Sequence, residues 1–137
     1  MSKMLSVVYC DRIQNDMTDK GPVRSIVTPL SELNPISIPG NYSFSIACVM
    51  AGFDITKNNK IEIGFYDPDG NLNTQIMNLV IAANSITVPD GQAFPEYFNL
   101  DLDVRNAILL KEGEYNTRIK HNDIELGNYP ILVRARR

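Results

Sequence analysis

Apolar and polar residues alternate along several segments of this chain, with the period of two that is typical of a β-strand. The clearest case is residues 98–105, where four apolar residues alternate with asparagine, two aspartates and arginine. Residues 42–50 alternate in the same way, with large apolar side chains on one face and serine, alanine and valine on the other. Each segment is therefore predicted to bury one face and to turn the other toward solvent.

Further strands are predicted where apolar runs are bounded by turn residues, at 4–13, 23–28, 61–66, 72–81, 115–120 and 124–134. The polar stretch 15–22 is expected to end the first strand, and the proline-rich stretch 29–40 is expected to be an irregular connection. A single helical turn is expected at 107–112. Seven or eight short strands at this spacing predict an all-β protein, an antiparallel β-sandwich or barrel.

The composition agrees with strands and with one domain over residues 1–137. Fifteen isoleucines and nine valines far outnumber seven alanines, and β-branched side chains favour pleated sheets over helices. The apolar stretches are too short to span a bilayer, so no membrane association is expected. With no export signal recognised at the N-terminus, the expected compartment is the cytoplasm, where Cys10 and Cys48 stay reduced.

The charge distribution argues against non-specific nucleic-acid binding. The formal net charge is −3, but three of the thirteen basic residues are Arg134, Arg136 and Arg137. Without them the chain has ten basic and sixteen acidic residues, a net charge of −6. An acidic body does not neutralise phosphates, which is the main source of non-specific affinity for nucleic acids.

Three passages carry a resemblance to a known family: Val8-Tyr9-Cys10-Asp11, the hairpin Phe65-Tyr66-Asp67-Pro68-Asp69-Gly70, and Glu112-Gly113-Glu114-Tyr115 followed by Ile119-Lys120-His121-Asn122-Asp123-Ile124. They resemble a family of short, uncharacterised bacterial and phage-associated proteins with an immunoglobulin-like β-sandwich, a domain of unknown function. The resemblance implies that fold over most of the chain, and it supplies no catalytic residues. Gly113-x-Tyr115 is also typical of the tyrosine corner of Greek-key sandwiches.

The acidic pairs have structural interpretations that we prefer to catalytic or metal-binding ones. Asp67, Asp69 and Asn71 alternate as in a calcium loop, but the glycine and the glutamate that an EF-hand requires are missing, so a hairpin turn is predicted. Asp101 and Asp103 have the spacing of a glycosidase pair, yet they lie on the polar face of a predicted strand. Asp103 is expected to pair with a neighbouring arginine.

The scarce nucleophilic and metal-binding groups also receive structural interpretations. His121 is predicted to be an exposed loop histidine, because no nucleophile elbow accompanies it. Cys10 and Cys48 are predicted to pack as small apolar side chains. No metal site, cofactor or catalytic residue is therefore assigned, and the protein is expected not to be an enzyme.

Function is expected at the loops, since rigid sandwiches present binding surfaces there. The leading hypothesis is a non-enzymatic module that binds another protein. Two alternatives stay open: a phage- or mobile-element-encoded factor that blocks a host defence component or its nucleotide signal, and a structural assembly subunit of a virion. A homodimer through an edge strand is also left open. The candidate partner-binding residues are Asp54, Lys57, Asn59, Phe94, Glu96 and Tyr97.

Overall fold

The computed structural model describes residues 2–85 and 97–136, and these residues form nine β-strands and no helix. The strands are β1 (Lys3–Thr18), β2 (Gly21–Pro29), β3 (Glu32–Leu33), β4 (Gly40–Ala51), β5 (Asn59–Tyr66), β6 (Leu72–Ile81), β7 (Tyr97–Leu109), β8 (Gly113–His121) and β9 (Ile124–Val133). The all-β prediction is confirmed, but the predicted number of seven or eight strands is too low. Residues 107–112 form no helical turn, because β7 continues to Leu109.

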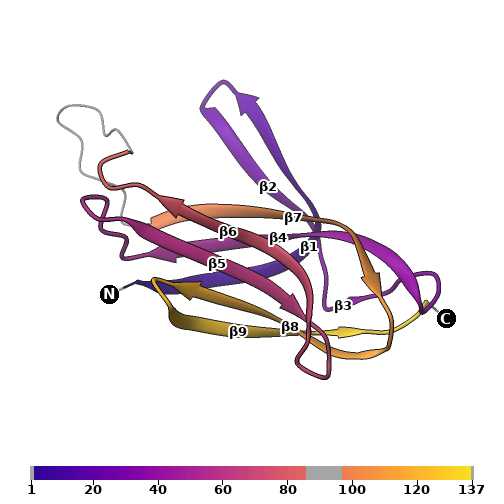
Figure 1. Cartoon of the computed structure of the whole chain (residues 1–137). Coiled ribbons are helices and arrows are strands. Elements are labelled where there is room, and N and C mark those ends of the chain that lie inside the picture. The colour runs from indigo at the N-terminus through magenta and orange to yellow at the C-terminus, as the bar shows by residue number, and fades with distance from the viewer. Residues whose placement is uncertain (1, 86–96, 137) are drawn as a thin grey trace.

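The strands form two sheets that face each other in a β-sandwich (Figure 1). One sheet has the order β2-β1-β4-β7, and the other has the order β3-β9-β8-β5-β6. Consecutive strands lie in the same sheet only at β1 and β2, β5 and β6, and β8 and β9, and every other connection between the described strands crosses from one sheet to the other. All pairs are antiparallel except β3 with β9, a two-residue parallel contact within the stretch that was predicted to be irregular.

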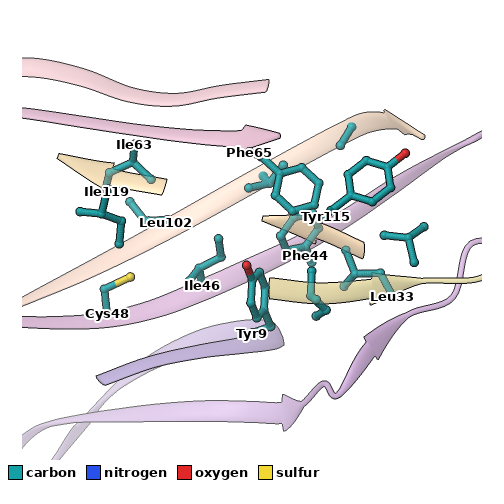
Figure 2. Close-up of a cluster of buried hydrophobic side chains, with 14 of the residues drawn as sticks. Tyr9, Leu33, Phe44, Ile46, Cys48, Ile63, Phe65, Leu102, Tyr115 and Ile119 are labelled. Atoms are coloured by element: carbon teal, nitrogen blue, oxygen red, sulfur yellow. The ribbon is translucent and has the colours of Figure 1, made fainter. Parts of the chain in front are cut away.

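The core lies between the sheets, where the apolar faces of β4, β5, β7 and β8 meet (Figure 2). Phe44, Phe65 and Tyr115 form an aromatic row, with ring centroids 5.3 Å apart at each step. The hydroxyl of Tyr115 donates to the backbone carbonyl of Lys111, which confirms the predicted tyrosine corner.

Tyr9 connects the two sheets through its hydroxyl group. The hydroxyl lies 2.6 Å from Thr117 Oγ1 and donates to the carbonyl of Tyr129, so it is satisfied although the ring is buried. Burial raises the pKa of Tyr9 to about 12, because the charged phenolate would lose its hydration. β1 is thereby held against β8 and β9 of the opposite sheet.

A two-stranded hairpin leaves the sandwich after Cys10, where the prediction from the sequence was wrong. β1 pairs with β4 only as far as Cys10, and it then continues to Thr18 paired with β2 alone. The polar segment 15–22 is therefore strand and tight turn, because an exposed ribbon needs no apolar alternation. Thr28, with φ of 54°, lies between the pairs Cys10–Pro29 and Arg12–Val27, where β1 leaves β4. The hairpin of β1 and β2 rises from the sheet (Figure 1).

The hairpin leans over the outer face of the four-stranded sheet. Arg24 of β2 reaches across to Asp101 of β7, with 2.7 Å between Nε and Oδ1. Under this crossing, Ser45 and Ala47 are buried, although both point away from the core. The sequence predicted these small residues to face solvent, but they lie on the face that the Arg24 side chain crosses, and Asp101 is the cross-strand neighbour of Ala47.

Candidate functional site

Three segments meet at one end of the sandwich: the β4–β5 loop, the β8–β9 turn and the beginning of β1 (Figure 1). They line a pocket of about 510 Å³, which we call the end pocket. Its lining residues are Ser2, Lys3, Gly52, Asp54, Lys57, Asn59, His121, Asn122, Ile124, Glu125 and Leu126. The three candidate residues of the β4–β5 loop, Asp54, Lys57 and Asn59, are therefore part of one site.

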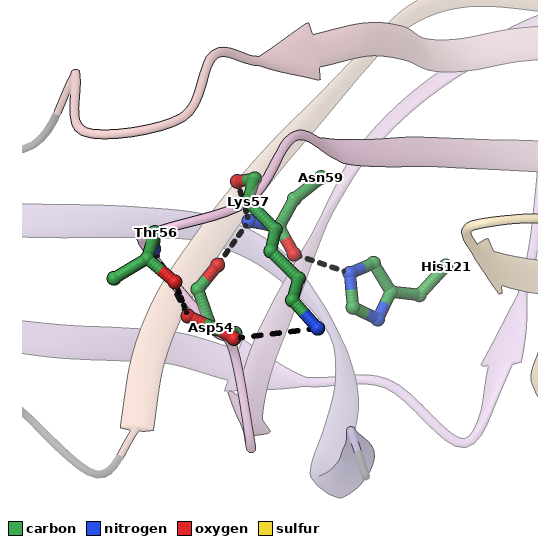
Figure 3. Close-up of polar contacts among 5 residues, drawn as sticks. All are labelled: Asp54, Thr56, Lys57, Asn59 and His121. Atoms are coloured by element: carbon green, nitrogen blue, oxygen red, sulfur yellow. Dashed lines mark hydrogen bonds and ion pairs between the residues drawn. The ribbon is translucent and has the colours of Figure 1, made fainter.

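The β4–β5 loop is ordered by its own polar groups (Figure 3). Oδ1 of Asp54 accepts hydrogen bonds from the backbone N–H and the hydroxyl of Thr56, at 3.0 Å and 2.6 Å. These two donors stabilise the carboxylate and lower the pKa of Asp54. Nζ of Lys57 lies 3.9 Å from the other carboxylate oxygen, so the loop presents a loose ion pair at its exposed surface.

The buried side chain of Asn59 holds the β4–β5 loop in place. Its side chain is 4% exposed, and its amide nitrogen donates to the backbone carbonyls of Asp54 at 3.0 Å and Lys57 at 3.1 Å. Its amide oxygen accepts from Nε2 of His121 at 2.7 Å. All the strong hydrogen-bonding groups of the Asn59 side chain are thus used inside the protein, and the residue positions the loop.

His121 is buried, contrary to the prediction of an exposed loop histidine. It is the last residue of β8, is 7% exposed, and packs edge-on against Phe53 with a centroid distance of 4.9 Å. Because the oxygen of Asn59 can only accept, Nε2 of His121 carries the proton, and Nδ1 accepts from the hydroxyl of Ser2. Loss of hydration on burial lowers the pKa of His121, which favours this neutral form.

The order Ser2, His121, Asn59 is that of a nucleophile, a base and an orienting group. Here the amide of Asn59 is held by two loop carbonyls, and the imidazole ring is enclosed by Phe53. These contacts give the trio a structural explanation, in which it ties the beginning of β1 to β5 and β8. This trio cannot be recognised in the sequence, because 119 positions separate Ser2 from His121 and no local motif joins them.

The rim of the end pocket combines apolar surface with charges of both signs. Ile124 is 61% exposed, and Leu126 is partly buried against the core. Lys3 and Glu125 line the same pocket. An exposed aliphatic side chain among charged groups is suited to recognition of a protein surface rather than of a bare ion.

The other three candidate partner-binding residues are not among the described residues that line the end pocket. Phe94 and Glu96 are outside the described residues, and Tyr97 is described only as the first residue of β7. The predicted hairpin turn at Asp67 is confirmed, because its carboxylate accepts from the N–H groups of Asp69 and Asn71, at 2.9 Å each.

The remaining polar candidates also occupy structural positions. Asp101 pairs with Arg24 of the hairpin, and Asp103 lies 3.7 Å from Arg105 as expected. Cys10 and Cys48 are free and buried, and burial raises the pKa of both thiols, that of Cys48 to about 12. Among the residues that the structure describes, no group of three or more histidines, cysteines and carboxylates is placed to hold a metal ion. The same part of the chain forms no helix of the length and apolarity needed to cross a membrane.

The strand order, the tyrosine corner and the parallel contact of β3 with β9 define an immunoglobulin-like β-sandwich. The chain belongs to a family of unknown function, DUF6941, whose model matches residues 5–134. The resemblance noted in the sequence is thus confirmed for the family and the fold. A similar solved structure is that of an immunoglobulin-like protein from Pseudomonas aeruginosa, with a TM-score of 0.47 and 12% identity over 98% of this chain and 97% of the other. No curated protein sequence matches the chain.

Proposed function

We propose that this protein is a non-enzymatic module that binds another protein through the end pocket. The observation that carries the proposal is the organisation of the β4–β5 loop, which is held by the buried Asn59 and opens on a pocket with an exposed aliphatic rim. A loop ordered before binding loses less conformational entropy when a partner docks. Asp54 and Lys57 would then contact the partner, and Ile124 would supply the apolar anchor.

The candidate catalytic side chains are already engaged in hydrogen bonds and ion pairs within the protein, and this favours a binding role over catalysis. His121, the only histidine of the chain, donates a hydrogen bond through Nε2 to Asn59, accepts one at Nδ1 from Ser2, and is 7% exposed. Away from the pocket, Asp101 and Asp103 of the four-stranded sheet are engaged with Arg24 and Arg105 of the same sheet. The two free, buried cysteines support a reducing compartment, and we propose the cytoplasm.

The test uses affinity capture from the native host, followed by isothermal titration of the captured protein against purified variants. Ile124→Asp removes the apolar anchor and Lys57→Glu reverses a charge of the loop. The matched control is Leu110→Asp, because Leu110 is 68% exposed and lies between β7 and β8, at the other end of the sandwich. We expect both end-pocket variants to bind at least tenfold more weakly, and the control to bind like the wild type.

Equal affinities for the wild type and all three variants would overturn the end-pocket proposal. The non-enzymatic assignment has its own test, in which the protein is incubated with panels of ester, phosphodiester and glycoside substrates. Turnover that is lost in His121→Gln would overturn that assignment. The phage-encoded blocking factor and the virion subunit are not proposed further, because no feature of the described residues favours either one.

A further inference from the structure

A small hollow lies on the outer face of the five-stranded sheet, away from the end pocket. Ile63 and Phe65 of β5 point into the core, so Gly64 between them faces outward. The hollow has a volume of about 100 Å³ and is lined by Glu62, Gly64, Tyr66, Gln75, Arg118 and Lys120. This volume accommodates a single side-chain head group rather than a whole small molecule.

The floor of the hollow depends on the absence of a side chain at position 64. A Cβ there would lie 2.9 Å from Cε1 of Tyr66 and 3.0 Å from Cδ1 of Leu72. Without it, the Tyr66 ring lies across the sheet surface beside the glycine. The guanidinium of Arg118 stacks on this ring, with its central carbon 4.5 Å from the ring centroid.

The stacking uses the face of the Arg118 guanidinium, and no carboxylate among the described residues forms an ion pair with its donor edge. The two cross-strand neighbours of Arg118 are Gly64 and Asn128, neither of which is a carboxylate. A planar guanidinium that stacks through its face keeps its N–H groups in the plane, where they match both oxygens of a carboxylate. Lys120 adds a second positive charge at the wall of the hollow.

The carboxylate of Glu62 influences which anions can bind to the forked N–H groups of Arg118. This carboxylate is 3.3 Å from Nζ of Lys60, so its charge is partly compensated, but it still faces the hollow. The repulsion between like charges grows with the magnitude of each charge. Glu62 therefore disfavours a phosphate, which carries nearly two negative charges, relative to a carboxylate, which carries one. The exposed side chain of Leu72 next to Gly64 offers apolar contact to the chain that carries the carboxylate.

We propose that this hollow is a second protein-docking site, in which Arg118 binds the carboxylate of a glutamate or aspartate from an acidic, leucine-containing segment of a protein partner. Tyr66 holds the guanidinium in orientation, and Gly64 makes room for the Tyr66 ring. The proposal goes beyond the end pocket and shares none of its residues.

The test is a titration of the ¹⁵N-labelled full chain with an acetylated hexapeptide of alternating leucine and glutamate, followed by amide chemical shifts. We expect saturable shifts at Gly64, Tyr66 and Arg118, and none with the peptide that has glutamine in place of glutamate. Arg118→Gln should weaken binding at least fivefold. Arg118→Lys keeps the positive charge but loses the paired N–H donors of the guanidinium. Its affinity for the peptide should lie between that of the wild type and that of Arg118→Gln.

The matched control is Arg105→Gln, which removes the same charge from the other sheet and should leave the affinity unchanged. Equal weakening by both glutamine variants, shifts centred elsewhere, or no shifts at all would overturn the proposal. Tighter binding of the corresponding phosphoserine peptide would overturn the assignment of a carboxylate. Ile124→Asp should bind the peptide like the wild type, which separates this result from the outcome at the end pocket.

Discussion

The hydroxyl of Tyr115 donates a hydrogen bond of 2.9 Å to the carbonyl of Lys111, four residues earlier in the chain. This bond ties the connection between β7 and β8 to the last ring of the aromatic row, which stacks on Phe65. It places a phenol at the edge of the core with its polar end satisfied. The same contact fixes the β7–β8 loop, which connects the two sheets, to the core.

Removal of that hydroxyl should destabilise the protein without changing its fold. Tyr115→Phe is expected to lower the free energy of unfolding by about 1–2 kcal/mol, because the Lys111 carbonyl loses its partner. Denaturant unfolding measures the change. Tyr42→Phe is the control, since the hydroxyl of Tyr42 makes no hydrogen bond within the described part of the chain, and a loss as large in this control would contradict the prediction.

Asn59→Ala should release the β4–β5 loop. Two backbone carbonyls and the N–H of His121 lose their partner, so we expect a loss of about 1–3 kcal/mol in unfolding free energy. Limited proteolysis should show faster cleavage between 54 and 57. Asn128→Ala, at an exposed asparagine of β9, is the control, and an unchanged cleavage rate in Asn59→Ala would show that the loop is ordered by other contacts.

The pH dependence of stability should report the burial of His121. Its pKa is lowered in the folded state, so the unfolded chain binds this proton more readily. The contribution of His121 is therefore present above the unfolded pKa of about 6.5, and it is lost as the pH falls from that value toward the folded pKa. Because this is the only histidine, its imidazole resonance can be titrated directly by NMR.

A second test compares the free energy of unfolding of the wild type and of His121→Gln over the same series of pH values. The wild type should lose more stability than His121→Gln between pH 7 and pH 5.5, since glutamine does not titrate. A measured folded-state pKa at or above the usual value, or parallel pH profiles for the two proteins, would contradict the buried neutral histidine.

Gly127 is expected to tolerate no side chain while Tyr129 stays in place. A Cβ at position 127 would lie 2.5 Å from Cζ of Tyr129, so the ring would have to move. Gly127→Ala should cost about 1–3 kcal/mol, the usual range for overpacking. In the Tyr129→Ala background the same substitution should cost much less, and equal costs in both backgrounds would show that the ring is not the obstacle.

The crossing of Arg24 to Asp101 should hold the β1–β2 hairpin against the sheet. Asp101→Asn leaves the largely buried guanidinium without its charge partner, and we expect a loss of about 1–2 kcal/mol, reduced because Asp101 is one-third exposed. Hydrogen exchange should accelerate between 21 and 27. Asp11→Asn, an exposed aspartate of the same hairpin, is the control, and the same exchange rates in Asp101→Asn and the wild type would contradict this role.

Much of the strand pattern could be predicted because it follows from local chemistry. Leu102 and Val104 are buried, while Asp101, Asp103 and Arg105 face outward, as their alternation requires. Asp67 closes its turn with its own side chain, and Tyr115 forms the expected corner. Neither feature needs information from distant parts of the chain to be recognised.

The sequence alone determined the alternation of faces, the turns and an antiparallel sandwich or barrel, since each depends on neighbouring residues and on a period of two. The immunoglobulin-like form of the sandwich was implied by the family resemblance. Only the tertiary structure decided which exposed positions are covered. Ser45 is buried on the face that the Arg24 side chain of the hairpin crosses to reach Asp101, and His121 is buried because Ser2, Phe53 and Asn59 converge on it from other strands and loops. Burial of a polar group depends on what packs above it, and that depends on contacts between residues far apart in the chain.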